Sequence, residues 1–279
     1  MFIVNSLIGV ADLHCGCRLG LCPPKGAKLR LGGTYKPSKF QKGLGRYWKE
    51  FWEKWVPMAV RRDDYGVVVN GDLIEGRHHG ATTPWSNDIA DQADAAYELL
   101  APIVDMCDGR FWVIGGTEAH GGAFVENEER LAQRLGAVPD PEGICARPEL
   151  WKYVGQKKEI LTHWLHHIGV TGSSAYETTA PHKEFIQACE EAGKWGRRPP
   201  DIVIRAHRHR FVKTEVATDN ERGVAIVLPS WQGKTYYTYR VAGARQSQPQ
   251  FGGIMIRLSE EGEPYTRQKI FSLKRPEAE

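Results

Sequence analysis

Histidines and carboxylates gather at the ends of several apolar runs in this 279-residue sequence. Imidazole nitrogens mixed with carboxylate oxygens suit borderline divalent metals such as Mn, Fe, Zn or Ni better than Ca or Mg. The set is too large for one tetrahedral site and predicts two metals that share a bridging carboxylate. The candidate residues are Asp12, His14, Asp72, Glu118, His120, His166, His167, His207 and His209.

The spacing of two pairs indicates that their side chains converge. Asp12 and His14 form a D-x-H pair, and His207 and His209 form an H-x-H pair. Alternate residues of a strand point to the same side, so each pair is expected to reach one locus. In the adjacent histidines at 166 and 167 this alternation does not decide which one faces the metals, and His166 is the preferred ligand.

The elements that must position these residues alternate between strand and helix as far as about residue 210. Short runs rich in β-branched and aromatic residues predict strands at 2–14, 65–72, 110–120, 159–169 and 201–209. Apolar residues at helical spacing predict helices at 37–60, 87–107, 126–136 and 180–196. This alternation predicts a layered α/β fold. Five further strand-like runs follow, at 211–218, 223–233, 235–241, 252–259 and 267–273, and predict a second sheet or the far half of a sandwich.

Two details of the helical segments can be checked directly. Ser38 is a candidate N-cap, and Gly136 is a candidate helix terminator. The aromatic residues at positions 47, 48, 51, 52 and 55 are expected in the core, because an aromatic stripe at helical spacing is more often buried than part of a ligand site. No repeat or linker divides the sequence, so one domain spanning 1–279 is expected.

Composition and charge exclude several classes of protein. Hydrophobic residues make up 41% and charged residues 25%, as in ordinary globular domains, and the formal net charge is only +3. This charge permits an anionic partner but falls short of the basic stripe of a dedicated nucleic-acid binder. The sequence contains no signal-peptide pattern and no apolar run near membrane-spanning length, which predicts a cytoplasmic protein without a membrane partner.

The cysteines show no convincing metal or disulfide pattern. Cys15, Cys17 and Cys22 form a C-x-C-x4-C cluster that lacks the second paired half of a structural zinc site. Without a secretory signal disulfides are not expected, so free thiols are predicted. Thiol catalysis by Cys15 or Cys17 is an alternative, although no dedicated base is identifiable beside them.

The order of five motifs resembles the calcineurin-like metallophosphoesterases. They are "DLH" at 12–14, "GDLIEG" at 71–76, "GTEAH" at 116–120, "HH" at 166–167 and "AHRH" at 206–209, and they span about 200 residues. The segments "GLCPP", "GGTYKPSKFQ" and "HHIGVTGSSAYETT" are similar to a subgroup often encoded by phages and prophages. The resemblance implies a four-layer α-β-β-α sandwich of two mixed sheets flanked by helices.

The resemblance also implies roles for individual residues. Asp12, His14 and His209 would bind one metal, and Asp72 would bridge both. His207 and a histidine of the 166/167 pair would bind the second metal. His120 would lie beside the substrate and protonate the leaving oxygen or stabilise the transferring phosphoryl group. The cofactors would be two divalent ions, Mn first and Fe, Zn or Ni as alternatives, with a bridging hydroxide as nucleophile.

The third motif departs from the family pattern. The family usually has G-N-H there, whereas this sequence has no Asn between Gly116 and His120. Either Glu118 supplies an oxygen ligand in place of Asn, or Thr117 holds that position and the second metal is bound more weakly. Glu118 is preferred, because a carboxylate is the better ligand for a divalent ion. In the fifth motif Ala206 replaces the usual Gly, and its small side chain is expected to leave the ligands in place.

The resulting hypothesis is a metal-dependent hydrolase of phosphate esters, most of all a phosphodiesterase or nuclease acting on nucleotide, DNA or RNA. Basic residues at 205, 208 and 210 and the aromatic Trp231 motivate this substrate class, with Arg208 and Trp231 as candidate substrate contacts. A phosphomonoesterase or protein phosphatase is the alternative enzyme. A nucleic-acid-binding protein with a vestigial metal site is the alternative outside catalysis.

Overall fold

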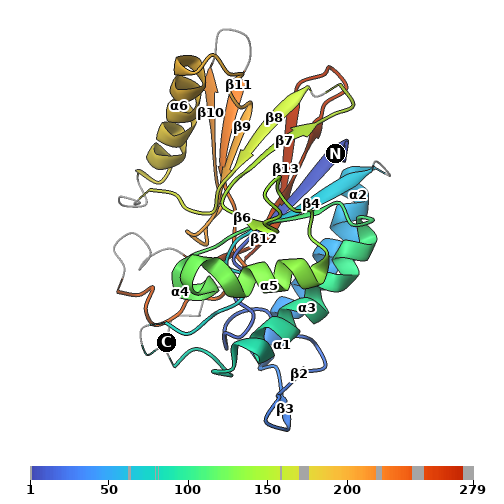
Figure 1. Cartoon of the computed structure of the whole chain (residues 1–279), viewed down its shortest axis with the longest axis vertical. Coiled ribbons are helices and arrows are strands. Elements are labelled where there is room, and N and C mark those ends of the chain that lie inside the picture. Colours follow the sequence, from blue (N-terminus) through green and yellow to red (C-terminus); the bar gives the residue numbers. More distant parts are fainter. Residues whose placement is uncertain are drawn as a thin grey trace.

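Two mixed β-sheets lie face to face at the centre of the structure, a computed structural model (Figure 1). It describes residues 2–61, 64–78, 80, 82–157, 159–169, 176–217, 222–240 and 248–272. The first sheet has the order β13-β12-β1-β4-β5-β6. Its strands are β1 (Ser6–Val10), β4 (Tyr65–Asn70), β5 (Phe111–Ile114), β6 (Ala146–Arg147), β12 (Gln250–Leu258) and β13 (Pro264–Ser272). Strands β1, β4, β5 and β6 are parallel to one another, whereas β12 pairs antiparallel with β1 and β13 pairs antiparallel with β12.

The second sheet has the order β10-β11-β9-β8-β7. Its strands are β7 (Leu150–Val154), β8 (Ile160–Trp164), β9 (Ile202–Arg205), β10 (Val212–Ala217) and β11 (Arg222–Val227). Strands β8, β9 and β11 are parallel, and β7 and β10 are antiparallel to their neighbours. The inner faces of the two sheets share one apolar core, in which Leu7 and Trp112 of the first sheet pack with Trp164 and Ile204 of the second. A small hairpin of β2 (Ala27–Lys28) and β3 (Thr34–Tyr35) lies apart.

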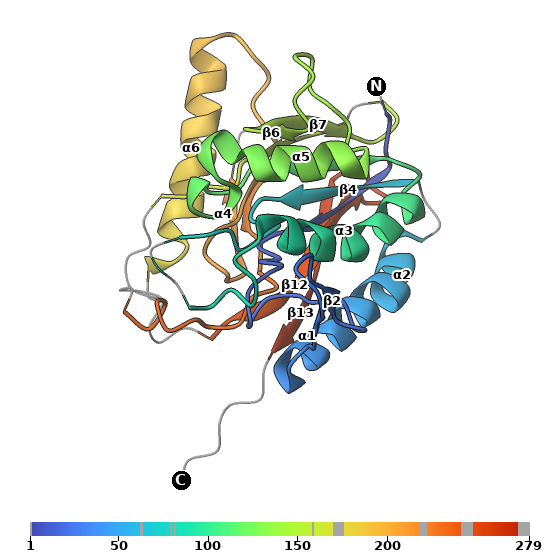
Figure 2. The same cartoon turned by 60° about the horizontal axis from the view of Figure 1, so that its bottom comes forward.

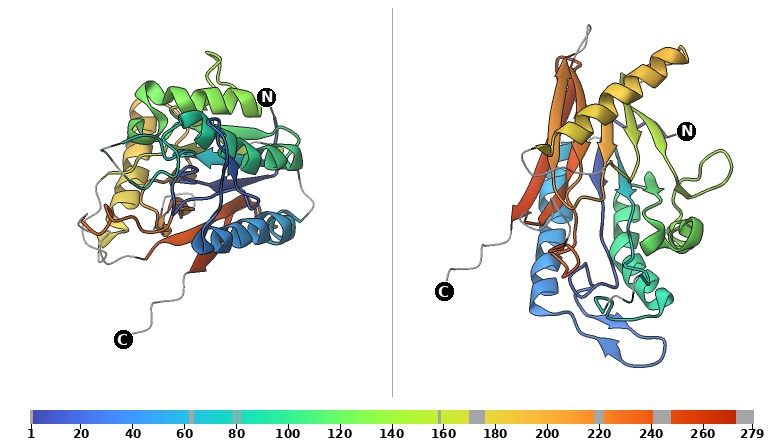
Figure 3. Two further views of the ribbon diagram at one scale, coloured as in Figure 1. Left: turned by 90° about the horizontal axis from the view of Figure 1, so that it is seen from below. Right: turned by 90° about the vertical axis from the view of Figure 1, so that its left-hand side faces the viewer.

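Helices cover the outer faces, so the fold has the expected four layers, α-β-β-α (Figure 3). On the first sheet lie α1 (Lys39–Glu50), the π-helical turn η1 (Phe51–Trp55), α2 (Val56–Val60), α3 (Ile89–Met106) and α5 (Glu126–Leu135). On the second sheet lies α6 (Thr179–Lys194), which packs on β9, β10 and β11. The α/β fold class predicted from the sequence is confirmed.

Local signals explain where the helices begin and end. Ser38 caps α1 in a reciprocal capping box, because its Oγ accepts from the Gln41 backbone N–H at 3.2 Å while Gln41 Oε1 accepts from the Ser38 N–H at 3.0 Å. Gly136 ends α5 in the left-handed conformation, with φ of 69°. Trp48 of α1 and Trp52 and Trp55 of η1 are buried in the core. All three predictions are confirmed.

The C-terminal strands differ from the prediction. They do not make one additional sheet: β10 and β11 join the second sheet, whereas β12 pairs with β1 of the first, with Met255 opposite Ile8. The strand predicted at 235–241 is wrong, because 236–240 form turns, and position 241 is outside the described residues. All six cysteines are free, as predicted. Within the described ranges no helix combines the length and apolar character needed to cross a membrane.

Candidate metal centre

The candidate residues come together at the carboxyl ends of parallel strands from both sheets. Asp12 follows β1, Asp72 follows β4, His166 follows β8 and His207 follows β9. Since parallel strands end at one edge of a sheet, and the two sheets lie face to face, these four loops meet between them. Figure 2 brings this end of the molecule towards the viewer.

Four candidate metal groups occur among the described residues, and two of them combine the ligands expected from the motifs. Asp12, His14 and His209 form the first of these two. Asp12 Oδ1 lies 3.3 Å from His209 Nε2 and 4.0 Å from His14 Nε2. The two histidine Nε2 atoms approach each other to 3.2 Å. One ligand atom from each residue can therefore reach a common cation.

Asp72, His166 and His207 form the second group. Asp72 Oδ2 lies 3.2 Å from His166 Nε2 and 3.9 Å from His14 Nε2 of the first group. Its other oxygen, Oδ1, accepts from the backbone N–H of Thr117 at 2.7 Å and from the Thr117 hydroxyl at 3.1 Å. One oxygen of Asp72 is thus anchored, and the other faces both groups, as a bridging carboxylate requires.

The donor atoms of this cluster fit cations. Asp12 Oδ1, Asp72 Oδ2 and His166 Nε2 are buried without a hydrogen-bond partner, which is costly unless a further group satisfies them. His166 donates its Nδ1–H to the Asn70 carbonyl at 2.7 Å, and His14 donates its Nδ1–H to Glu75 Oε2 at 2.9 Å. Both imidazoles therefore present Nε2 to the centre, in the manner of metal-bound histidines supported by an outer hydrogen bond.

Charge in the cluster is set by the carboxylates. Burial raises the pKa of Asp72, but the charge of nearby His166 outweighs burial and holds this pKa well below its usual range. Burial likewise opposes ionisation of Asp12, and His209 and His166 lower its pKa. Burial lowers the pKa of His166, but Asp72 and Asp12 raise it to about 10. Without a metal, protons on imidazoles balance the two carboxylates.

The backbone at the candidate ligands is left-handed. The φ angles are 54° at Asp12, 46° at His14, 51° at Asp72, 71° at His207 and 54° at His209. Positive φ is uncommon outside glycine and tends to cluster at functional sites. The D-x-H and H-x-H pairs thus converge because the chain turns after β1 and β9 have ended, and the explanation from strand alternation is wrong.

The adjacent histidines at 166 and 167 face different environments. His166 is 1% exposed and belongs to the second group. His167 is exposed, and among the described residues it joins no candidate metal group. Its ring centre lies 5.2 Å from that of His207. The structure therefore brings His166 into the cluster and leaves His167 at its edge.

In the third motif, the positions of Glu118 and Thr117 differ from those preferred in the sequence analysis. Glu118 begins the short helix α4 (Glu118–Gly121), its side chain is exposed, and it is in none of the candidate metal groups found among the described residues. Thr117 is buried and contacts Asp72 through both its N–H and its hydroxyl. The expectation that Glu118 replaces the missing Asn as a ligand does not fit this geometry, and Thr117 occupies the position facing Asp72.

His120 lies on α4 at the border of the cluster. Its Nε2 is 4.0 Å from Asp72 Oδ2, and its ring packs edge-on against His14 with centres 4.5 Å apart. It donates Nδ1–H to the Glu75 carbonyl at 2.6 Å, which leaves Nε2 facing the centre. Burial and the neighbouring His14 lower the pKa of His120 to about 4.

Sequence reasoning missed three buried polar residues that support the cluster. Glu75, inside the second motif, accepts from His14 and, at 2.9 Å, from Gln232 Nε2. Glu128 of α5 accepts from the backbone N–H groups of Leu73 at 2.6 Å and Gly116 at 2.7 Å, and so fixes the second and third motif loops. Glu75 was visible as an acid in an apolar segment next to Asp72, but no signal marks Gln232 or Glu128.

The two candidate substrate contacts, Trp231 and Arg208, differ in how deeply they are buried. Trp231 is fully buried, packs edge-on against Trp48 with ring centres 4.8 Å apart, and donates its backbone N–H to the Asp12 carbonyl at 2.9 Å. It is a core residue and presents no face to a substrate, so that expectation is wrong. Arg208 is half-buried and donates to the Gly169 carbonyl.

Acidic partners occupy the two neighbouring basic residues. Arg205 Nε donates to Glu184 at 3.1 Å, and Arg210 Nε donates to Glu177 at 2.5 Å. A large share of the basic charge counted beside the fifth motif is therefore neutralised.

The cysteines beside the first motif are not activated. Cys15 and Cys17 are buried, and burial raises the pKa of both thiols above the usual range. A nucleophilic cysteine requires the opposite shift. Thiol catalysis is therefore not supported.

Comparisons with known proteins find distant structural similarity. Vps29 from Chaetomium thermophilum is 11% identical over 99% of this chain and 100% of that protein, with a TM-score of 0.38. The sulfate thiohydrolase SoxB from Termus thermophilus, in complex with glycerol, is 10% identical over 98% of this chain and 57% of that chain, with a TM-score of 0.39. No family model and no curated protein matches the sequence.

Proposed function

We propose that this chain is a metal-dependent phosphoesterase with a dinuclear centre, and a member of the calcineurin-like metallophosphoesterases that its motifs resemble. Two candidate ligand groups carry the proposal, one of Asp12, His14 and His209 and one of Asp72, His166 and His207. Their buried Asp12 Oδ1, Asp72 Oδ2 and His166 Nε2 atoms have no hydrogen-bond partner. Asp12, His14 and His209 would hold one cation and His166 and His207 the other, with Asp72 available to both. When bound, two such cations activate water and neutralise phosphate charge.

The protein's own residues position this chemistry. Glu75 and the Asn70 carbonyl fix the rings of His14 and His166, and Thr117 fixes Asp72. His120 directs Nε2 towards the place where a phosphate ester would lie. The negative charge of the ester favours the imidazolium form of His120, which can then donate its Nε2–H to the leaving oxygen.

Phosphodiesters are the proposed substrate class, as nucleotide or nucleic acid. The mildly basic chain and the exposed tyrosines at 236, 237 and 239 support this choice. Manganese is the first metal proposed, with Fe, Zn or Ni as alternatives. The single domain over 1–279, the phage-type subgroup and the cytoplasmic location stay predictions from the sequence.

Metal analysis combined with two model substrates tests the proposal. We expect two divalent ions per chain and faster hydrolysis of bis(p-nitrophenyl) phosphate than of p-nitrophenyl phosphate. A strong preference for the monoester would contradict the diesterase assignment and support a phosphomonoesterase.

The altered third motif motivates a second candidate function. Glu118 does not reach the cluster, so the second group has three ligands from His, Asp and Glu residues in the described part of the chain. A vestigial metal site on a nucleic-acid-binding protein would match this loss. Purified protein that hydrolyses neither ester with added manganese, yet retards DNA in a gel, would establish that alternative.

A further inference from the structure

Three tyrosines project outward from the turn at 234–240, which we call the tyrosine turn. Tyr236 is 74% exposed, Tyr237 68% and Tyr239 58%. Backbone hydrogen bonds, from the N–H of Thr238 to the Thr235 carbonyl at 3.1 Å and from that of Arg240 to the Tyr237 carbonyl at 2.9 Å, order the turn. The rings are therefore displayed by backbone geometry, whereas tyrosines normally bury most of their apolar surface.

The tyrosine turn leaves directly from the metal centre. Trp231 donates its backbone N–H to Asp12, and Gln232 Nε2 donates to Glu75, the residue that orients His14. Tyr236 lies four positions after Gln232, so their Cα atoms are at most about 14 Å apart. Residues 231 and 232 are fixed beside the cluster, so the tyrosine turn begins next to it.

Two cations accompany the rings. Lys234 Nζ lies 4.1 Å from the centre of the Tyr239 ring, and Arg240 Cζ lies 4.9 Å from the centre of the Tyr236 ring. Both are cation–π contacts. Aromatic faces combined with Lys and Arg match a flexible anion that also carries flat rings.

We propose that the tyrosine turn binds single-stranded nucleic acid, with tyrosines stacking on unpaired bases and Lys234 and Arg240 contacting phosphates. This inference rests on the proposed phosphodiesterase function and names its substrate class. Stacking requires the free face of a base, which a duplex hides between its neighbours. The turn therefore selects single strands and delivers their backbone to the metal centre.

Binding measured without turnover tests this inference. In EDTA, the anisotropy of a fluorescein-labelled dT12 oligonucleotide reports its Kd for the full chain. Loss of one stacked base weakens binding by about 5- to 150-fold, so the Tyr236→Ala/Tyr239→Ala variant should raise Kd at least about 10-fold. The Tyr236→Phe/Tyr239→Phe variant keeps the rings and should bind nearly as the unaltered protein does.

A matched control lies elsewhere on the molecule. Tyr265 of β13 is 39% exposed and has Arg257 Cζ 5.2 Å from its ring centre, so it reproduces the chemistry of the turn at another site. Tyr265→Ala should leave the Kd for dT12 unchanged. Tyr265→Ala should also hydrolyse bis(p-nitrophenyl) phosphate at the rate of the unaltered protein.

Three outcomes would overturn the inference. The first is an unchanged Kd in the double Ala variant, and the second is a Kd for a 12-base-pair duplex equal to that for dT12. The third is a sedimentation coefficient, measured without oligonucleotide, that differs between the double Ala variant and the unaltered protein, because the turn would then be an interface between copies. Failure of the proposed function is distinguishable: the metal-loaded chain would then hydrolyse no ester, while dT12 binding would still depend on the tyrosines.

Discussion

Two buried histidines three residues apart, one within β8 and one just beyond it, have pKa values shifted in opposite directions. His166, just beyond β8, is 1% exposed, and His163, within β8, is 6% exposed. Burial lowers the pKa of both. Asp72 and Asp12 raise the pKa of His166 to about 10, whereas Arg205 adds to the effect of burial on His163 and brings its pKa to about 4, against the opposing charge of Glu149.

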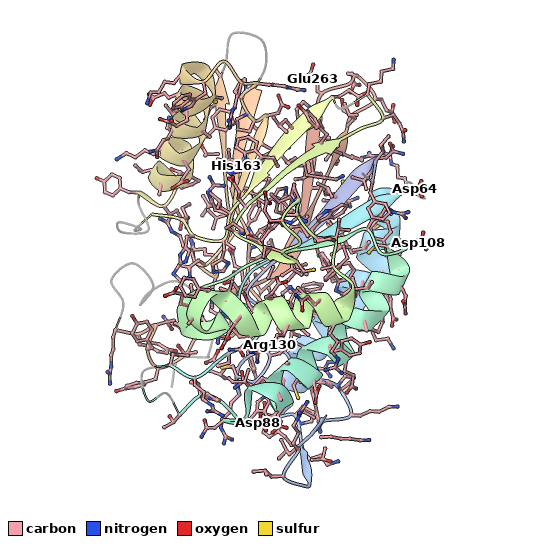
Figure 4. All side chains as sticks on the ribbon, in the orientation of Figure 1. Asp64, Asp88, Asp108, Arg130, His163 and Glu263 are labelled. Atoms are coloured by element: carbon pink, nitrogen blue, oxygen red, sulfur yellow. The ribbon has the colours of Figure 1, made fainter. Side chains whose placement is uncertain are left out.

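The difference follows from which side of the second sheet each ring faces. His166 points between the sheets into the metal centre. His163, labelled in Figure 4, lines a cavity of about 530 Å³ between β7, β8 and α6, and its ring stacks against Trp151 with centres 4.0 Å apart. Burial alone therefore does not produce a cationic imidazole. A pair of carboxylates does, and the same pair belongs to the candidate metal groups.

The largest effect is expected from removing the Asp72 carboxylate, which raises the pKa of His166 but is absent from the surroundings of His163. Asp72→Asn removes the charge that holds His166 and the oxygen that both groups share, so metal content and hydrolysis should both be abolished. Metal analysis and turnover of bis(p-nitrophenyl) phosphate measure this. Glu149→Gln is the matched control, since it removes the carboxylate 3.0 Å from His163, and it should retain metal and activity. Metal retained by Asp72→Asn would contradict its bridging role.

Replacing His120 separates turnover from metal binding. His120→Gln removes a proton donor but no proposed ligand, so metal content should be kept while turnover falls by about 10²- to 10⁴-fold. Unchanged turnover would remove His120 from the reaction.

Glu75→Gln should act through His14. Loss of the carboxylate behind a ligating histidine typically weakens metal binding by about 10- to 100-fold. Competition with a chelating dye measures the affinity. Equal affinity in Glu75→Gln and Glu149→Gln would mean that Glu75 has no special part in the metal centre.

His163 should make the metal-free protein sensitive to acid. Its folded pKa of about 4 lies below the usual 6.5, so the unfolded chain binds the proton more strongly between these values and stability falls as the pH drops. At pH 5 this loss is about 2 kcal/mol. Urea unfolding at pH 5 and pH 7 should show a smaller difference in His163→Gln than in the unaltered protein. Identical differences would mean that His163 does not titrate as its surroundings imply.

The smallest effect concerns the third motif. Glu118→Gln should change metal affinity by no more than about twofold, because exposed charges outside a site contribute little. Thr117→Val removes a hydrogen bond to Asp72 and should weaken affinity more, by about 2- to 10-fold. A larger loss of metal affinity in Glu118→Gln than in Thr117→Val would support Glu118 as the ligand.

Local patterns predicted the elements well but not their long-range pairing. Ser38, Gly136 and the buried tryptophans carry signals within a few residues, and the structure confirms them. The placement of β12 depends on pairing with β1, nearly the whole chain away, and no local signal encodes that partner. For the same reason the C-terminal strands were assigned to one sheet although they divide between two.

At the metal centre, residue types were readable and their orientation was not. Asp12, His14, Asp72, His166, His207 and His209 were all identified from motif order, and the structure brings them together. Whether Glu118 or Thr117 faces Asp72 is decided by the start of α4, and the burial of Trp231 is decided by aromatic neighbours from η1 and α1. Such choices depend on packing between segments distant in the sequence.

The left-handed backbone of the five ligand residues has a consequence for how metals come and go. Their conformation costs about 1–2 kcal/mol per residue, which the packing of the surrounding strands and cores must offset. We therefore expect the candidate ligands to keep their arrangement without metal, unlike those of zinc fingers, which unfold without it. Chelation should empty the site without unfolding the chain, and refilling should be reversible. The choice of metal would then depend on ligand chemistry and metal availability, because the donor set of imidazoles and carboxylates accepts several divalent ions.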